Sequence, residues 1–323
     1  MTIEMAAIGV DLGATKIASA LVSAHGDVLA ARQTQTQSVE GSEAVLDRLA
    51  AEIEALIFEA RCPVAGVGIG SPGVVDPVNG IVRGAVNLNW DEVHLVAGLQ
   101  ARLTGELPIF VQKDTNASAL GELFFGAGQG CQDFVYLSIG SGLGGGVIAN
   151  GQLVIGANGI AAELGHLSLD PEGPPCICGL RGCAELTVSG PGMVNLARQR
   201  LNSGARIGEI CDPDELTPAG ILEAAGRGDA AALSVLARAG SDLGAVMAAC
   251  TAVLNPQRYV IGGGLGLAAF DYIVPAARRE LERRVTPAGM RRLEIVPSLL
   301  PSSAVGAACL VWQSKGAEKC VEY

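Results

Sequence analysis

The chain has 323 residues, of which 49% are hydrophobic and 17% are charged, so it is long enough to form two domains with substantial cores. Its formal net charge of −11 argues against a protein that binds nucleic acid through a broad basic surface. The N-terminus lacks a basic segment followed by a long apolar stretch, and no run approaches the roughly 20 apolar residues that span a bilayer. We therefore expect a cytoplasmic protein that binds neither nucleic acid nor a membrane.

The first predicted elements are three strands and a helix. Residues 5–23 contain two apolar segments joined by the sequence DLGATK, and residues 26–36 are expected to continue as a third strand. In residues 42–60 large apolar side chains recur at steps of three and four, which predicts an amphipathic helix with Ser42 as its N-cap.

The middle of the chain continues this alternation. Residues 64–73 are expected to form a strand that ends in a glycine–proline loop. Residues 107–114 are expected to form another strand, and residues 115–126 favour a helix that ends at a glycine.

A similar order then begins again. Residues 133–154 are expected to form two strands around a glycine-rich turn, as residues 5–23 do. A helix, a strand, a helix, a strand and a helix are expected at residues 243–255, 258–266, 272–285, 292–300 and 304–312. This order favours an α/β protein of two related lobes over a tandem of independent modules.

The first glycine loop, GVDLGATK, has the features of a phosphate-binding turn. Gly13 allows a sharp bend, the Thr15 hydroxyl and nearby N–H groups can bind phosphate, and Asp11 can hold a hydrated Mg²⁺. An ordinary hairpin turn would also account for this sequence.

Two further glycine loops follow strands. The loop at 139–146 contains a G-x-G-x-x-G match at Gly140, Gly142 and Gly145. A dinucleotide fold requires a helix to open inside this motif, whereas a strand is expected here, so the match favours a hairpin whose backbone approaches a phosphate. The loop at 260–266 lacks an acidic residue at the spacing of a dinucleotide site. A dehydrogenase is therefore not favoured.

Asp114 lies between a predicted strand and a predicted helix. An aspartate in this place is commonly an N-cap. The helix dipole would also favour its ionised form, which suits a base that accepts a hydroxyl proton during phosphoryl transfer.

A histidine and three cysteines have the spacing H-x9-C-x-C-x4-C. They form a complete ligand set for structural zinc: His166, Cys176, Cys178 and Cys183. The alternative is a loop of free cysteines beside a core histidine. The six other cysteines are scattered and are expected to be mostly buried or inert: Cys62, Cys131, Cys211, Cys250, Cys309 and Cys320.

Glu163 and Glu185 bracket this metal-binding pattern. They could support the metal ligands, contribute surface charge, or accept hydrogen bonds from the hydroxyls of a sugar.

With these motifs the chain resembles the sugar kinases of the ROK family (repressor, open reading frame, kinase), close to bacterial glucokinases, over nearly its whole length. The matching stretches are IGVDLGATKI, GVGIGSPGVVD, VNLNW, DTNASALGE, IGSGLGGGVI, ELGH, CICGLRGCAE and YVIGGGL. The resemblance implies an α/β, actin-like (ribonuclease H-like) ATPase fold with two lobes around a cleft. Residues 1–114 and 304–323 would form the smaller lobe, and residues 115–303 the larger lobe with the zinc loop.

The resemblance also implies ATP- and Mg²⁺-dependent phosphorylation of a hexose at its 6-hydroxyl, with Asp114 as the general base. The residues expected to bind the sugar, near the Gly70–Gly73 loop, are Gly73, Asn87, Lys113, Glu163, His166 and Glu185. Those expected to bind ATP and Mg²⁺ are Asp11, Gly13, Thr15, Lys16, Gly140, Ser141, Gly142, Gly144, Gly263 and Gly264. The family further suggests a structural Zn²⁺ and a homodimer or homotetramer.

The chain departs from the family pattern at Lys113, where kinases of the family usually have an asparagine that contacts a sugar hydroxyl. Lysine only donates hydrogen bonds and carries charge. If Lys113 faces the cleft, it would alter sugar preference, stabilise ionised Asp114 or favour an anionic sugar derivative. If it points away, none of this follows. Asn89 replaces a common glycine beside Trp90, and Ser141 replaces the usual threonine while keeping the hydroxyl.

Two questions stay open at this point. The phosphoryl donor could be ATP or another polyphosphate. The alternative function is a non-catalytic sugar sensor of the ROK family that acts through a protein partner. The acidic composition and the start of the chain at the first phosphate-loop strand disfavour a DNA-binding repressor.

Overall fold

We describe a computed structural model of residues 5–204, 206–208 and 212–314. The chain divides into two compact units. Unit 1 comprises Met1–Cys131, Gly146–Ala161 and Leu299–Tyr323, and unit 2 comprises Gln132–Gly145 and Ala162–Ser298. The lobe boundaries expected from the sequence stay a prediction, and residues 315–323 of the expected smaller lobe lie outside the described residues.

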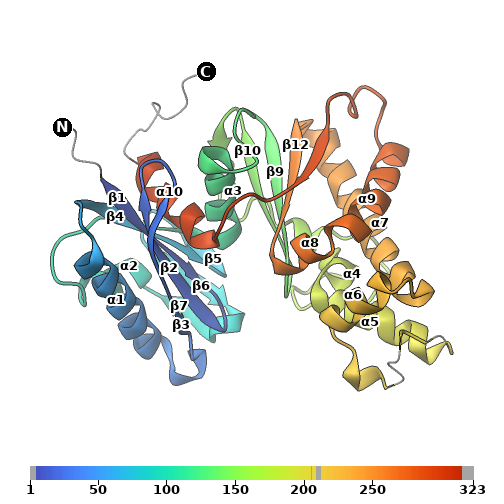
Figure 1. Cartoon of the computed structure of the whole chain (residues 1–323), viewed down its shortest axis with the longest axis horizontal. Helices are drawn as coiled ribbons and strands as arrows, with labels where there is room; N and C mark the ends of the chain where they lie inside the picture. The colour runs from blue at the N-terminus through green and yellow to red at the C-terminus, as the bar shows by residue number, and fades with distance from the viewer. Residues whose placement is uncertain (1–4, 205, 209–211, 315–323) are drawn as a thin grey trace. The chain divides into compact units, whose positions relative to one another are not determined.

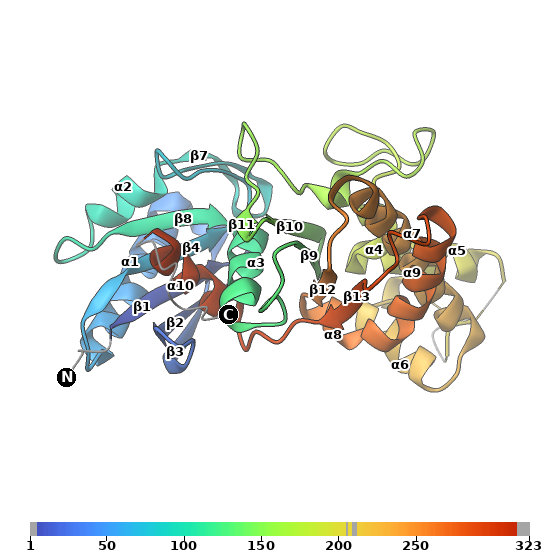
Figure 2. The same ribbon diagram turned by 90° about the horizontal axis from the view of Figure 1, so that it is seen from above.

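The sheet of unit 1 lies among the blue and cyan elements of Figure 1, and Figure 2 shows its strand order, β3-β2-β1-β4-β8. Its strands are β1 (Ala6–Leu12), β2 (Lys16–Ser23), β3 (Val28–Gln35), β4 (Val64–Ser71) and β8 (Ile109–Lys113). Strands β1, β2 and β3 form an antiparallel meander, whereas β4 is parallel to both β1 and β8. Strands β1 and β4 are almost entirely buried, as expected for strands covered on both faces, whereas exposure alternates along the edge strand β3.

The large apolar side chains of this sheet pack in one core cluster with helices and a second, small sheet. These elements are α1 (Ser42–Glu59), α2 (Leu95–Gln100), β5 (Val74–Asp76), β6 (Ile81–Ala85) and β7 (Trp90–Val93). The 3₁₀ turns η1 (Ser38–Glu40) and η2 (Val86–Leu88) precede α1 and β7. The expectation that Ser42 caps α1 is wrong, because Gly41 is the N-cap and provides no side chain for a capping bond.

Helix α10 (Ser303–Ser314) packs on the opposite face of the same sheet, beside α3 (Asp114–Phe125). Figures 1 and 2 show this C-terminal helix, in red, against the blue N-terminal strands. Small residues make this close approach possible. A Cβ atom on Gly9 would lie 1.8 Å from the Ala304 carbonyl oxygen, and one on Gly68 would lie 1.9 Å from the Ala307 carbonyl oxygen.

The second sheet has the order β11-β10-β9-β12-β13. Its strands are β9 (Phe134–Ile139), β10 (Leu143–Ala149), β11 (Gln152–Leu153), β12 (Arg258–Gly262) and β13 (Glu294–Pro297). In both sheets the order is third, second, first, fourth and fifth strand of the set. This shared topology confirms the internal repeat expected from the sequence.

The helices of unit 2 include one that is long and strongly apolar. They are α4 (Glu185–Val188), α5 (Gly190–Asn202), α6 (Pro218–Gly226), α7 (Ala230–Leu254), α8 (Gly264–Ala268) and α9 (Phe270–Arg284), with 3₁₀ turns η3 (Leu164–His166) and η4 (Pro213–Glu215). By length and composition alone, α7 is long and apolar enough to cross a membrane. However, 61% of its apolar window is buried and it packs against α9 and α5, as a core helix does.

The scattered cysteines mostly occupy buried positions, as expected. Cys131, Cys250 and Cys309 are buried and Cys62 is half-buried. Cys211 and Cys320 lie outside the described residues.

Candidate active site

The carboxyl ends of parallel strands bring several predicted site residues to one edge of the unit 1 sheet. Asp11 of β1 is in register with Gly70 of β4, and Ser71 at the end of β4 is in register with Lys113 at the end of β8. Asp114 follows as the first residue of α3, and a Cβ atom on Gly70 would lie 3.2 Å from its Cα atom. This edge is where ligands bind in open α/β sheets.

Asp11 and Asp114 interact electrostatically at this edge. Burial of Asp11, and next the negative charge of Asp114, raise the pKa of Asp11 to about 6. A hydrogen bond with Ser303 and the charge of Lys16 act in the opposite direction. Asp114 is not the N-cap of α3, because Lys113 holds that position, and its carboxylate instead accepts the N–H of Thr115 at 2.6 Å. Two interacting carboxylates at one edge of a sheet suit a site that receives a divalent cation.

The DLGATK turn is fixed by backbone bonds and by one buried threonine. Gly13 donates its N–H to the Lys16 carbonyl at 2.9 Å, and a Cβ atom on Gly13 would lie equally close to that oxygen. Thr36 is fully buried. Its hydroxyl donates a hydrogen bond to the Gly13 carbonyl at 2.7 Å, and its N–H donates one to the Thr15 carbonyl. Thr15 and Lys16 are exposed. The turn therefore presents a rigid backbone and two exposed side chains.

Lys113 is 8% exposed at the end of β8. Because side chains alternate along a strand, Lys113 lies on the same face of β8 as Val111. Val111 belongs to the core cluster that also contains Val75 of β5 and Ala85 of β6. Gly73 packs against Ala85, since a Cβ atom on this glycine would lie 3.0 Å from the Ala85 Cβ. Lys113 therefore lies on the face of the sheet where β5 and β6 pack.

The VNLNW stretch forms η2 and the start of β7. Asn87 is exposed, whereas the Trp90 side chain is buried. Asn89 has a φ of 57°, in the left-handed region that favours glycine and that asparagine tolerates best among the other residues. This conformation explains why asparagine can stand at this position.

In unit 2 the four predicted zinc ligands converge. Their ligand atoms all lie within 4.8 Å of one another. Cys176 Sγ is 3.8 Å from His166 Nδ1, and Cys178 Sγ is 3.6 Å from Cys183 Sγ. Adjacent ligands of a tetrahedral zinc site are roughly 3.6–3.8 Å apart, given Zn–S and Zn–N bonds of about 2.3 and 2.0 Å. The distances fit zinc, and they exceed the roughly 2 Å of a disulfide.

Without a metal, the Cys183 thiol of this cluster stays protonated at neutral pH. Burial, and next hydrogen bonds with the neighbouring thiols, raise the pKa of Cys183 to about 12. A zinc ion at this cluster would supply the positive charge that stabilises three neighbouring thiolates. Since His166 faces the thiols through Nδ1, its Nε2 is directed away from the cluster and is available to another group.

Glu163 and Glu185 flank the four predicted zinc ligands in different ways. Glu163 is exposed, is the N-cap residue of η3 and follows Ala162, whose φ of 64° is unusual for alanine. Glu185 is half-buried and begins α4, and its Oε2 accepts the N–H of Leu143 at 2.9 Å.

The two glycine loops of unit 2 leave the carboxyl ends of neighbouring parallel strands. Residues Gly140–Gly142, which we call the glycine turn, follow β9, and Gly263 and Gly264 follow β12. Gly263 has a φ of 78°, and a Cβ atom on it would lie 2.4 Å from the Ile139 carbonyl oxygen. Strand β10, not a helix, follows the glycine turn and contains Gly144, while Ser141 is exposed. The G-x-G-x-x-G match is therefore part of a hairpin, as expected.

Comparison with known proteins assigns the chain to a family. The sequence profile of the ROK family matches residues 7–314. The chain belongs to the ROK family. It is 36% identical over 315 residues to a glucokinase of Thermotoga maritima, covering 96% of this chain and 98% of that protein. A ROK family glucokinase from Streptomyces griseus, solved in complex with glucose and AMPPNP, superposes with a TM-score of 0.79 at 34% identity, covering 95% of this chain and 99% of that one.

A regulator of the ROK family is also similar in structure. A ROK family transcriptional regulator, homologous to the MLC protein of E. coli, has a TM-score of 0.85 at 29% identity, covering 96% of this chain and 78% of that one. These likenesses confirm the expected actin-like ATPase fold. The fold is thus shared by kinases and regulators of the ROK family, so function depends on the site.

Three residues that support the candidate active site were not predicted from the sequence. Thr36 anchors the DLGATK turn, Ser303 bonds to Asp11, and Ser189 caps α5 by accepting the N–H of Gly192. Only Ser189 had a local signal, a serine followed by proline in the first helical turn. The others act across long sequence separations.

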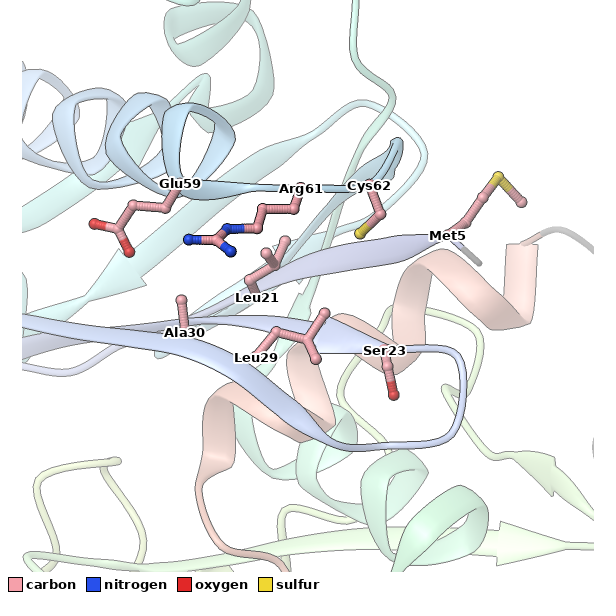
Figure 3. A pocket seen from close by; sticks show the side chains of 8 residues that line it. All are labelled: Met5, Leu21, Ser23, Leu29, Ala30, Glu59, Arg61 and Cys62. Carbon is pink, nitrogen blue, oxygen red and sulfur yellow. The ribbon is translucent and has the colours of Figure 1, made fainter. Parts of the chain in front are cut away.

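A hollow elsewhere in unit 1 is separate from these residues. It has a volume of about 360 Å³ and is lined by parts of β2 and β3 together with Glu59, Arg61 and Cys62 (Figure 3). No predicted sugar, nucleotide or metal ligand lines it.

Proposed function

We propose that this chain transfers the γ-phosphoryl group of ATP to the 6-hydroxyl of glucose or a close relative. The coarser statement, that it is an ATP-dependent hexose kinase, follows from its likeness to ROK glucokinases along nearly the whole chain. The finer assignment of the hydroxyl and of the base is our inference from the site.

The observation that carries this inference is the pairing of Asp11 and Asp114 at the carboxyl edge of the unit 1 sheet. In the proposed step the Asp114 carboxylate accepts the proton of the sugar 6-hydroxyl. The hydroxyl oxygen forms a bond to the γ-phosphorus, and the bond from that phosphorus to the oxygen bridging to the β-phosphate breaks, releasing ADP. Asp11 would hold the hydrated Mg²⁺, which neutralises phosphate charge when bound.

The residues that we propose for nucleotide binding contribute backbone groups more than side chains. In unit 1 the DLGATK turn offers N–H groups, the Thr15 hydroxyl and the Lys16 ammonium. In unit 2 the glycine turn with Ser141 and Gly144, and Gly263 with Gly264, would approach the phosphates and the nucleoside.

The residues that we propose for sugar binding are Gly73, Asn87 and Lys113 in unit 1, and Glu163, His166 and Glu185 in unit 2. The zinc cluster would hold the loop in one conformation, so that His166 Nε2 and the two carboxylates meet sugar hydroxyls without a large ordering cost. Lys113, a donor in the place of an asparagine, would change which hydroxyl pattern is preferred.

The experiment is a coupled ADP-release screen with glucose, mannose, fructose, allose and N-acetylated hexoses, using ATP and polyphosphate as donors. Asp114→Asn should abolish turnover while calorimetry still detects sugar binding. Asp271→Asn, an exposed aspartate of α9, is the matched control and should keep wild-type turnover. Normal turnover of Asp114→Asn would refute the assignment of the base.

The likeness to a ROK regulator supports a second candidate, a non-catalytic sugar sensor. The two candidates differ in one measurement. A sensor would bind the sugar and release no ADP with any hexose or donor in the screen. The homo-oligomeric state and the cytoplasmic location expected from the sequence stay predictions.

A further inference from the structure

The carboxylate of Glu185 is already engaged with the glycine turn. Its Oε2 accepts the N–H of Leu143, the residue that follows the turn, at 2.9 Å. A Cβ atom on Gly142 would lie only 2.5 Å from the same oxygen. The absence of a side chain at Gly142 thus allows the carboxylate to lie directly against the turn.

The same segment holds the other end of the turn. The Glu185 carbonyl accepts the hydroxyl of Ser189 at 2.7 Å, and Gly190 donates its N–H to the Gly140 carbonyl at 2.9 Å. Gly140 in turn donates its N–H to the Gly142 carbonyl at 3.0 Å. Residues 185–190 therefore fix the glycine turn at both ends.

This segment starts at the zinc cluster. Cys183 is two residues before Glu185, and its carbonyl accepts the N–H of Leu186. Ala184 is fully buried and donates its N–H to the Leu167 carbonyl beside His166. The position of Glu185 is thus set by the metal-binding loop on one side and by the glycine turn on the other.

We propose that Glu185 is a positioning residue for the phosphoryl-donor site, in addition to the sugar contact that the proposed function gives it. This inference rests on that proposed function. A carboxylate has two oxygens, so Oε2 can keep the Leu143 N–H while Oε1 accepts a sugar hydroxyl. One side chain then joins the donor site to the sugar site, so the factor by which sugar changes nucleotide affinity equals the factor by which nucleotide changes sugar affinity, because such coupling is reciprocal.

The test measures binding of Mg·AMPPNP by calorimetry in the absence of sugar, so that a sugar contact does not contribute. Glu185→Ala removes the acceptor and should weaken nucleotide binding about tenfold or more, the range expected for loss of a bond to a charged acceptor. Glu185→Gln retains an oxygen acceptor of the same reach. It should bind nucleotide within about threefold of wild type, yet bind glucose at least tenfold more weakly.

Glu172→Ala is the matched control, since Glu172 is an exposed glutamate of the same loop and should leave both affinities unchanged. Zinc content and melting temperature of every variant verify that the loop is intact. Wild-type nucleotide affinity in Glu185→Ala, or an equal loss in Glu185→Ala and Glu185→Gln, would overturn the inference. Failure of the wild type itself to bind Mg·AMPPNP would overturn the proposed function instead.

Discussion

Asp11→Asn should stabilise the ligand-free protein while removing its activity. In the folded chain, burial and the charge of Asp114 raise the pKa of Asp11 from 3.8 to about 6. An acid with a raised pKa binds its proton more tightly in the folded state, so its contribution to stability is complete below about pH 4 and is lost as the pH rises through 6. At pH 7.5 the ionised carboxylate therefore opposes folding.

The size of this effect follows from the pKa shift. About two units at 1.36 kcal/mol each correspond to roughly 3 kcal/mol, and because Asp11 keeps some contact with solvent we expect about 2 kcal/mol. Asparagine has the same shape as aspartate and no charge. The free energy of unfolding of the variant should therefore rise by this amount at pH 7.5 and by much less at pH 4. A stabilised but inactive variant is the usual signature of a functional site built at the expense of stability.

Urea unfolding followed by tryptophan fluorescence in magnesium-free buffer measures this gain. The two tryptophans of the chain, Trp90 and Trp312, both lie in buried positions of unit 1, so the signal reports the unit that contains Asp11. Asp91→Asn, at an exposed position of β7, is the control. The reasoning is refuted if Asp11→Asn is no more stable than wild type at pH 7.5, or if its gain is the same at pH 4.

Three further predictions concern the metal, the sugar and the packing of unit 1. Purified protein should contain about one zinc ion per chain. Removal of this ion by a chelator should lower both the melting temperature and the affinity for sugar. An absence of zinc by elemental analysis would contradict the assignment of the four ligands. Lys113→Asn should shift relative kcat/KM among the hexoses in the ADP-release screen, and an unchanged profile would place Lys113 outside the sugar site. Gly9→Ala should lower the free energy of unfolding by about 3 kcal/mol or more, because the new Cβ would overlap the α10 backbone. Gly98→Ala, which meets only the end of the Leu46 side chain, should change stability by less than about 1 kcal/mol; similar urea midpoints for these two variants would contradict the packing argument.

Much of the fold was predictable because its elements carry local periodic patterns. The strands that flank DLGATK and the glycine turn, and helix α1, occur within one or two residues of their predicted positions. The small sheet β5–β7 was not predicted from the sequence, because its strands have only three to five residues and are too short to show a clear alternation. The start of α7 predicted from the sequence is 13 residues too late, because the first half of this helix carries polar residues that obscure the apolar pattern.

For the candidate site, the sequence by itself predicted four zinc ligands, because a histidine and three cysteines at short spacing make a complete tetrahedral set of donors within one loop, and the structure brings these four side chains together. Only the tertiary structure decided that Ser303 meets Asp11, that Thr36 holds the first phosphate turn, and that Glu185 lies against Gly142. Each of these contacts joins residues more than 20 positions apart. Such contacts depend on which strands pair and which helix covers them, and local residue preferences carry no information about that choice.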